Sequence, residues 1–175
     1  MPVIRHDTYI EAPINVCFDL VRDVEIHTRT TSKTKERAVG GVTKGLLKEG
    51  DTVTWEATHF GVKQRLTAKV VKMEAPYKFT DVMLKGAFHS FTHTHEFLEH
   101  GQGTIMKDTF EYKSPLGIMG KMADKMFLEK YMQQFIIERA NELKKIAEAK
   151  LHMSQQGVSR WKQRMLDHLR RTGNF

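Results

Sequence analysis

Hydrophobic and polar residues alternate from residue 4 to residue 10, and this period of two predicts a strand with two different faces. Pro13 then stands where a helix can begin. The apolar residues that follow it recur at helical spacing: Ile14, Cys17, Phe18 and Val21. A second short helix is expected from residue 24 to about residue 31. The chain therefore opens with one strand and two short helices.

Residues 35–113 read as strands, because β-branched and aromatic residues alternate with polar ones between glycine and proline turn signals. Five main strands and a shorter one near 36–39 are expected. The main strands cover residues 52–60, 63–74, 78–85, 88–99 and 104–113. Because parallel pairs need long crossovers and these connections are short, the strands should form an antiparallel meander.

After residues 114–117 (SPLG) the hydrophobic period changes from two to about 3.6 and predicts an amphipathic helix of about thirty residues. Its apolar stripe includes Met119, Met122, Met126, Met132, Phe135, Ile136, Leu143 and Ile146. A break at Gly157 and a second helix from Ser159 to Arg171 should follow. The meander must bury its apolar face, and the long helix is the element large enough to cover it. The expected fold is α+β: a helix-grip, in which a curved antiparallel sheet wraps on a long C-terminal helix.

The composition is that of an ordinary globular protein: 175 residues, 40% hydrophobic and 28% charged, with one cysteine. Residues 1–150 should form a ligand-binding domain and residues 151–175 a basic helical tail. No apolar run is long enough to cross a bilayer and no secretory signal is visible, which favours a cytoplasmic protein. The net charge of +7 is scattered among carboxylates before residue 150. We therefore expect no nucleic-acid partner.

Four segments resemble the SRPBCC or START-like superfamily, which includes Bet v 1-like proteins. They are residues 10–20 (IEAPINVCFDL), 50–61 (GDTVTWEATHFG), 76–81 (PYKFTD) and 114–117 (SPLG). The resemblance spans roughly residues 2–150 and is strongest to the bacterial polyketide cyclase/dehydrase-like branch with coenzyme-Q-binding relatives. It implies the helix-grip fold and a deep cavity for a ligand. It does not choose among lipid carriers, receptors, cyclases and quinone-binding proteins.

Alternation along the predicted strands indicates which side chains point into the grip, because residues two apart share a face. The predicted ligand-binding residues are Trp55, His59, Phe79, Asp81, Met83, Phe91, His93, His95, Met106, Asp108 and Phe110, together with Met122 and Met126 of the helix. Apolar walls with a few convergent polar groups are typical of a ligand pocket. The leading hypothesis is therefore the binding or carriage of a small hydrophobic molecule, with no cofactor.

Three alternatives remain at this point. The first is a cyclase, dehydratase or hydrolase that uses His59, His93 or His95 with Asp81 or Asp108 as acid and base. The second is a cupin-like metal site, in which Glu99 would join His93 and His95. The third is a regulator that docks on another protein. A histidine–aspartate network that only braces the sheet would also explain the polar residues.

The tail carries an apolar stripe of Val158, Trp161, Met165 and Leu169 beside several arginines. Such a short helix is unstable alone and needs a surface to cover its stripe. The stripe could pack back on the domain, dock on a second copy as a homodimer, or lie on an anionic membrane.

Overall fold

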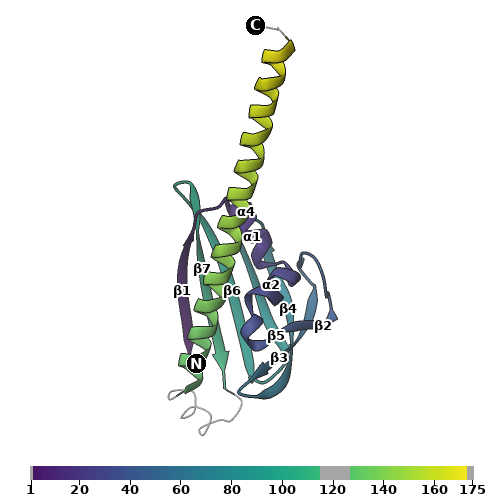
Figure 1. Cartoon of the computed structure of the whole chain (residues 1–175). Helices are drawn as coiled ribbons and strands as arrows, with labels where there is room; N and C mark the ends of the chain where they lie inside the picture. Colours follow the sequence, from purple (N-terminus) through teal and green to yellow (C-terminus); the bar gives the residue numbers. More distant parts are fainter. Residues whose placement is uncertain (1, 115–126, 173–175) are drawn as a thin grey trace.

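The computed structural model describes residues 2–114 and 127–172 as a seven-stranded antiparallel sheet crossed by one long helix (Figure 1). The strands are β1 (Val3–Ile10), β2 (Arg37–Gly41), β3 (Thr52–His59), β4 (Val62–Glu74), β5 (Lys78–Lys85), β6 (Ser90–His100) and β7 (Gly103–Lys113). The helices are α1 (Ile14–Val21), α2 (Val24–Thr30), the short 3-10 turn η1 (Ser32–Thr34) and α4 (Glu129–Thr172). This is the expected helix-grip, and the α+β prediction is confirmed.

The sheet is a meander closed by the first strand, with the order β1-β7-β6-β5-β4-β3-β2. Every neighbouring pair is antiparallel. Strands β2 to β7 follow one another across the sheet, and β1 pairs with β7, so β1 and β2 form its two edges. The helices between β1 and β2 must therefore cross the face of the sheet. Figure 1 shows α1, α2 and the first half of α4 on that same face.

Local sequence explains where the two short helices begin. Pro13 precedes α1, as the sequence predicts, because its missing N–H would have no helical partner there. Asp23 caps α2: its carboxylate accepts hydrogen bonds from the backbone N–H groups of Glu25 and Ile26. Such caps contribute about 1 kcal/mol to helix stability. Asp23 therefore fixes the start of α2 directly after the end of α1.

Two groups of buried side chains form the core. The first lies around α1 and includes Phe18, Phe79, Phe97, Met106 and Leu143. The second includes Trp55, Phe91, Phe110, Met132 and Ile136. Cys17 is a free thiol in the first group, and burial raises its pKa. The first group is a packed core, whereas the second surrounds the cavity described below.

The prediction of a break at Gly157 is wrong, because α4 continues without interruption to Thr172. A glycine inside a helix costs about 1 kcal/mol relative to alanine, which is not enough to end a helix when no proline follows. The start of the predicted helix, with Met119, Met122 and Met126, lies outside the described residues.

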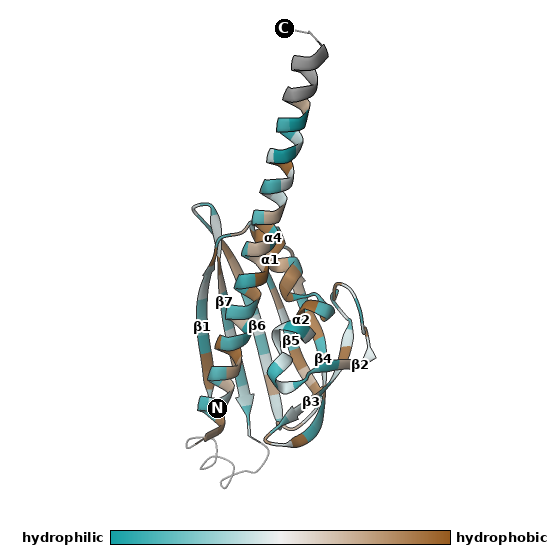
Figure 2. Ribbon diagram, in the orientation of Figure 1, coloured by the Kyte–Doolittle hydropathy of each residue, from teal (hydrophilic) through white to brown (hydrophobic). Residues whose placement is uncertain are grey.

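The last part of α4 projects away from the body of the protein (Figures 1 and 2). Of the three possibilities considered for the tail, packing back on the domain is therefore not found, because Val158, Trp161 and Met165 are exposed. No helix in the described ranges is sufficiently long and apolar to span a bilayer.

Candidate functional site

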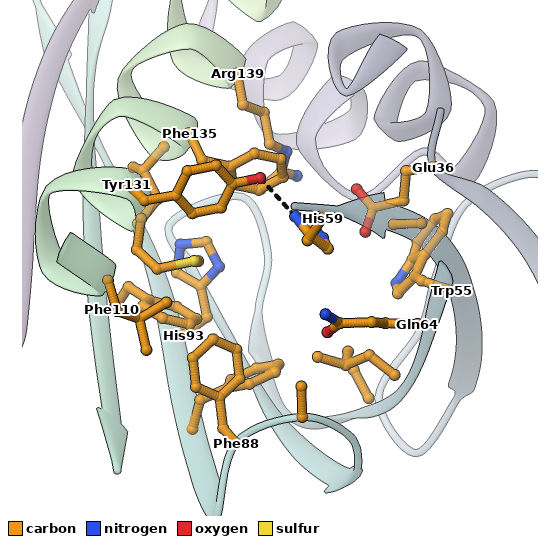
Figure 3. Close-up of a pocket in the computed structure, with 18 of the residues that line it drawn as sticks. Glu36, Trp55, His59, Gln64, Phe88, His93, Phe110, Tyr131, Phe135 and Arg139 are labelled. Atoms are coloured by element: carbon orange, nitrogen blue, oxygen red, sulfur yellow. Dashed lines mark hydrogen bonds between the residues drawn. The ribbon is translucent and has the colours of Figure 1, made fainter. Parts of the chain in front are cut away.

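A cavity of about 240 Å³ lies between the sheet and α4 (Figure 3). Its walls are mainly apolar and aromatic, and include Trp55, Phe88, Phe91, Phe110, Leu128, Met132, Phe135 and Ile136. Phe60 also lines the cavity and is 52% exposed. The cavity therefore reaches the surface beside the turn between β3 and β4.

Six of the predicted ligand-binding residues line this cavity: Trp55, His59, Asp81, Phe91, His93 and Phe110. Four others line two smaller neighbouring spaces. Phe79 and His95 line a space of about 60 Å³, and His95, Met106 and Asp108 line one of about 10 Å³. Strand alternation therefore finds the correct face of β3, β5, β6 and β7.

Met83 does not line any of these spaces. It lies one residue beyond the last β5–β6 pair, which Val82 forms with Thr92. Its sulfur approaches Gly86, and the side chain packs beside Leu66 at the margin of the second core group. Met83 pairs with Ala68, which lines the cavity, so Met83 keeps the predicted face but lies at its margin. Met122 and Met126 lie outside the described residues.

Several lining residues were not among the sequence predictions. Gln64 comes from β4, and the others come from helices or from the segment before β2: His27, Glu36, Tyr131, Phe135 and Arg139. For one of them, Arg139, the sequence does contain an indication. Arg139 falls between Ile136 and Ala140 on the apolar stripe of α4, where a charged residue needs an explanation. For His27 and Glu36 there was no such signal, because their contact depends on how α2 and β2 meet.

His27 and Glu36 form a partly buried pair in the wall of the cavity. His27 Nε2 lies 3.0 Å from Glu36 Oε2, and its ring stacks on Trp55 with 3.9 Å between ring centres. Burial lowers the pKa of His27. Burial alone would raise the pKa of Glu36, but His27, Thr31 and Arg139 together bring it below its usual value. A neutral imidazole that donates to an ionised carboxylate fits both directions.

Asp108 on β7 lies against two histidines of β6. Its Oδ1 is 2.5 Å from His95 Nδ1 and 3.3 Å from His93 Nε2. The two histidines and Asp108 therefore lie together, as in the histidine–aspartate network considered from the sequence, although the contacts have ion-pair distances without good hydrogen-bond geometry. Burial lowers the pKa of His95 to about 3. Burial would raise the pKa of Asp108, but His95 and His93 hold it well below its usual range.

Asp81 on β5 stands directly opposite His93 on β6. Its Oδ1 is 3.8 Å from His95 Nε2. Burial raises the pKa of Asp81, while His93 and Arg139 act in the other direction. Glu99 is exposed on β6 and does not join the two histidines. The cupin-like arrangement of His93, His95 and Glu99 is therefore not formed. Asp81 instead occupies the place beside the two histidines that this hypothesis gave to Glu99.

Arg139 brings a guanidinium to the polar side of the cavity. Its Nη2 donates a long hydrogen bond of 3.4 Å to the backbone oxygen of Val21, and its Nε is buried without a hydrogen-bond partner. Of the described carboxylates, none lies within ion-pair distance of it. Across the cavity mouth, Tyr131 of α4 and His59 of β3 are joined by a hydrogen bond of 2.7 Å (Figure 3).

Comparison with known families identifies the family of the chain. Residues 10–137 match the model of the family described as polyketide cyclase / dehydrase and lipid transport. The chain belongs to this family. A search of curated proteins gives no match.

Solved structures share the fold at low sequence identity. TTHA0849 from Thermus thermophilus is 22% identical, with a TM-score of 0.71 over 85% of this chain and 99% of that chain. Ginseng major latex-like protein 151 from Panax ginseng is 14% identical, with a TM-score of 0.64 over 83% and 97%. CV1439 from Chromobacterium violaceum is 11% identical, with a TM-score of 0.66 over 83% and 96%. These similarities confirm the helix-grip fold, and the match to the family model confirms the superfamily that the sequence resembles.

Proposed function

We propose that the protein binds or carries a small hydrophobic molecule in the cavity between the sheet and α4. The observation that carries the proposal is a largely apolar cavity that is open at Phe60 and has a small number of polar side chains in its wall. Apolar walls supply affinity, and a few polar groups set orientation. At about 240 Å³ the cavity is slightly smaller than the roughly 300–1,000 Å³ of typical ligand pockets. The ligand should therefore be compact.

The lining indicates how such a ligand would lie. Its apolar part would contact Trp55, Phe88, Phe91 and Phe110, which line the space. A polar group would face Arg139 and the neighbouring carboxylates and histidines. A compact aromatic or isoprenoid molecule with a hydroxyl or carbonyl group meets both requirements.

Trp55 fluorescence provides the test. Changing Trp161 to phenylalanine leaves Trp55 as the single tryptophan, and Trp161 lies on the projecting part of α4, away from the cavity. Short-chain quinones, flavonoid-like compounds and medium-chain lipids should be added in turn. At least one of these classes should change the Trp55 emission saturably. No response to any class would contradict the proposal.

A cavity-filling variant shows where the ligand binds. Ala57 is buried on β3 and lines the cavity, so Ala57→Phe should fill part of it and weaken binding about tenfold or more. Ala149→Phe is the matched control, because Ala149 is exposed on α4 outside the cavity. Equal affinities of the two variants, both folded by circular dichroism, would place the ligand elsewhere.

Acid–base catalysis on the bound molecule is the second candidate, because His93 and Asp81 both line the cavity and can reach its contents. The test is the mass of the ligand recovered after incubation. A change in mass that needs His93 would favour an enzyme such as a dehydratase or cyclase. Recovery of unchanged ligand would favour a carrier.

The projecting part of α4 presents an apolar stripe and positive charge for a docking partner. Val158 is 51% exposed, Trp161 60% and Met165 43%. The basic residues Arg160, Lys162 and Arg164 are exposed around them. A second copy of the chain and an anionic membrane surface are the two partners that this surface suits.

Deletion of residues 154–175 should leave the free energy of unfolding within about 0.5 kcal/mol of the full chain, because the exposed stripe does not cover the body. Urea titration measures this value. Size-exclusion chromatography then shows whether the full chain, but not the truncated chain, forms a dimer. Flotation with anionic or neutral vesicles shows whether only the full chain binds a membrane. A large loss of stability would show that the segment packs on the domain.

A further inference from the structure

Asp81, His93 and His95 form a compact set of donor atoms in the wall of the cavity. Asp81 lies on β5 and is the direct cross-strand neighbour of His93 on β6, and His95 follows two residues later on the same face. Each residue offers one donor atom, and these three atoms all lie within 4.8 Å of one another. Two imidazoles and a carboxylate are a common ligand set for divalent transition metals.

Asp108 is placed to orient both imidazoles. It contacts Nδ1 of His95 and Nε2 of His93, which leaves Nε2 of His95 and Nδ1 of His93 for another partner. Histidines that bind metals usually direct their second ring nitrogen at a carboxylate in this way, which fixes the tautomer. His95 is 2% exposed, so its free nitrogen has little access to bulk water.

Acidic side chains outnumber basic ones around this set. Among the described residues that line the cavity and its two neighbouring spaces, the carboxylates are Glu36, Asp81 and Asp108. The cations are Arg139 and Arg65, and Arg65 binds Glu56 at the surface. Three carboxyl groups therefore surround the set, together with one guanidinium that pairs with no described carboxylate. Carboxyl oxygens and imidazole nitrogens are common ligands of divalent cations.

The structure also contains room for an ion. A space of about 60 Å³ is lined by all three residues, and also by Arg139 and Phe79. A water molecule occupies about 30 Å³ in the liquid, so this space can hold an ion with one further ligand. Asp81 and His93 also line the main cavity. An open coordination position could therefore face a molecule bound there.

We propose that Asp81, His93 and His95 bind one divalent transition-metal ion, and that Asp108 positions the two histidines. Metal–nitrogen and metal–oxygen bonds of about 2.0–2.2 Å require the donors to move closer together by small side-chain rotations. This site goes beyond the proposed function, because metal binding needs no apolar ligand.

Cobalt(II) titration tests the proposal. The full chain is produced without a polyhistidine tag, stripped with a chelator and dialysed. Added Co²⁺ should bind at one ion per chain and give a visible absorption band typical of nitrogen and oxygen ligands, and Zn²⁺ should displace it. Absence of both stoichiometric binding and the band would overturn the proposal. The titration of Trp55 fluorescence with apolar ligands is done on the metal-free protein. Failure of metal binding and failure of ligand binding can therefore be distinguished.

Matched variants locate the ion. His95→Gln and Asp81→Asn should each weaken Co²⁺ binding by more than about 100-fold, and Asp108→Asn by about 10–100-fold. His100→Gln is the control, because His100 is exposed at the end of the same strand. Its affinity should equal that of the wild type. Circular dichroism verifies folding, and Asp81→Asn, a change of nearly equal size, is decisive if His95→Gln unfolds. Unchanged binding by folded Asp81→Asn, or a loss in His100→Gln, would overturn the assignment.

Discussion

Replacing Asp108 by alanine should lower the free energy of unfolding by about 3 kcal/mol in metal-free protein. Asp108 is 4% exposed and lies against His93 and His95, which are also buried. Removal of one partner from a buried polar pair typically costs about 3–5 kcal/mol, because the remaining groups stay buried without compensation. The lower end applies here, since burial lowers the pKa of His95 to about 3 and a neutral imidazole is cheaper to bury than a charge.

Urea titration in the presence of a chelator measures the loss. Asp7→Ala on β1 is the matched control, because Asp7 is exposed and its contact with Lys107 is 3.7 Å long. Exposed ion pairs contribute about 0–1 kcal/mol, so the control should remain close to the wild type. Equal effects of the two substitutions would mean that the β6 histidines find other partners without Asp108.

The face of each strand could be predicted because burial in a sheet repeats every two residues. On β6 the residues Phe91, His93, His95 and Phe97 are all buried, whereas Thr92, Thr94 and Glu96 between them are partly exposed. The same parity placed Asp108 beside the histidines, since His95 and Asp108 are direct cross-strand neighbours. The two-residue periodicity of the strands was therefore sufficient to predict that His93, His95 and Asp108 lie together.

The remainder of the site depends on contacts between distant parts of the chain. Arg139 reaches the cavity from α4, and His27 meets Glu36 only because α2 packs against the end of the sheet. The hydrophobic periodicity of the sequence does not predict such long-range contacts. The extension of α4 through Gly157 was missed for a different reason: a single glycine weakens a helix without determining its end.

Trp55→Ala should cost about 3 kcal/mol in unfolding free energy and should also weaken ligand binding. Trp55 is 6% exposed and stacks on His27, but one of its sides lines the cavity. Truncation of aromatic side chains in packed cores costs about 3–5 kcal/mol. A residue beside an existing cavity has fewer packing partners to lose, so the lower end of the range is expected.

Phe97→Ala is the comparison that separates stability from binding. Phe97 is fully buried against Phe18 and Phe79 and does not line the cavity, so its truncation should cost about 4 kcal/mol. Calorimetric titration below the melting temperature gives the affinity of the folded fraction of each variant, without relying on Trp55 fluorescence. Trp55→Ala should reduce that affinity, and Phe97→Ala should not. If both variants lose stability while the folded fraction of each binds normally, Trp55 belongs to the core alone and the ligand must lie away from it.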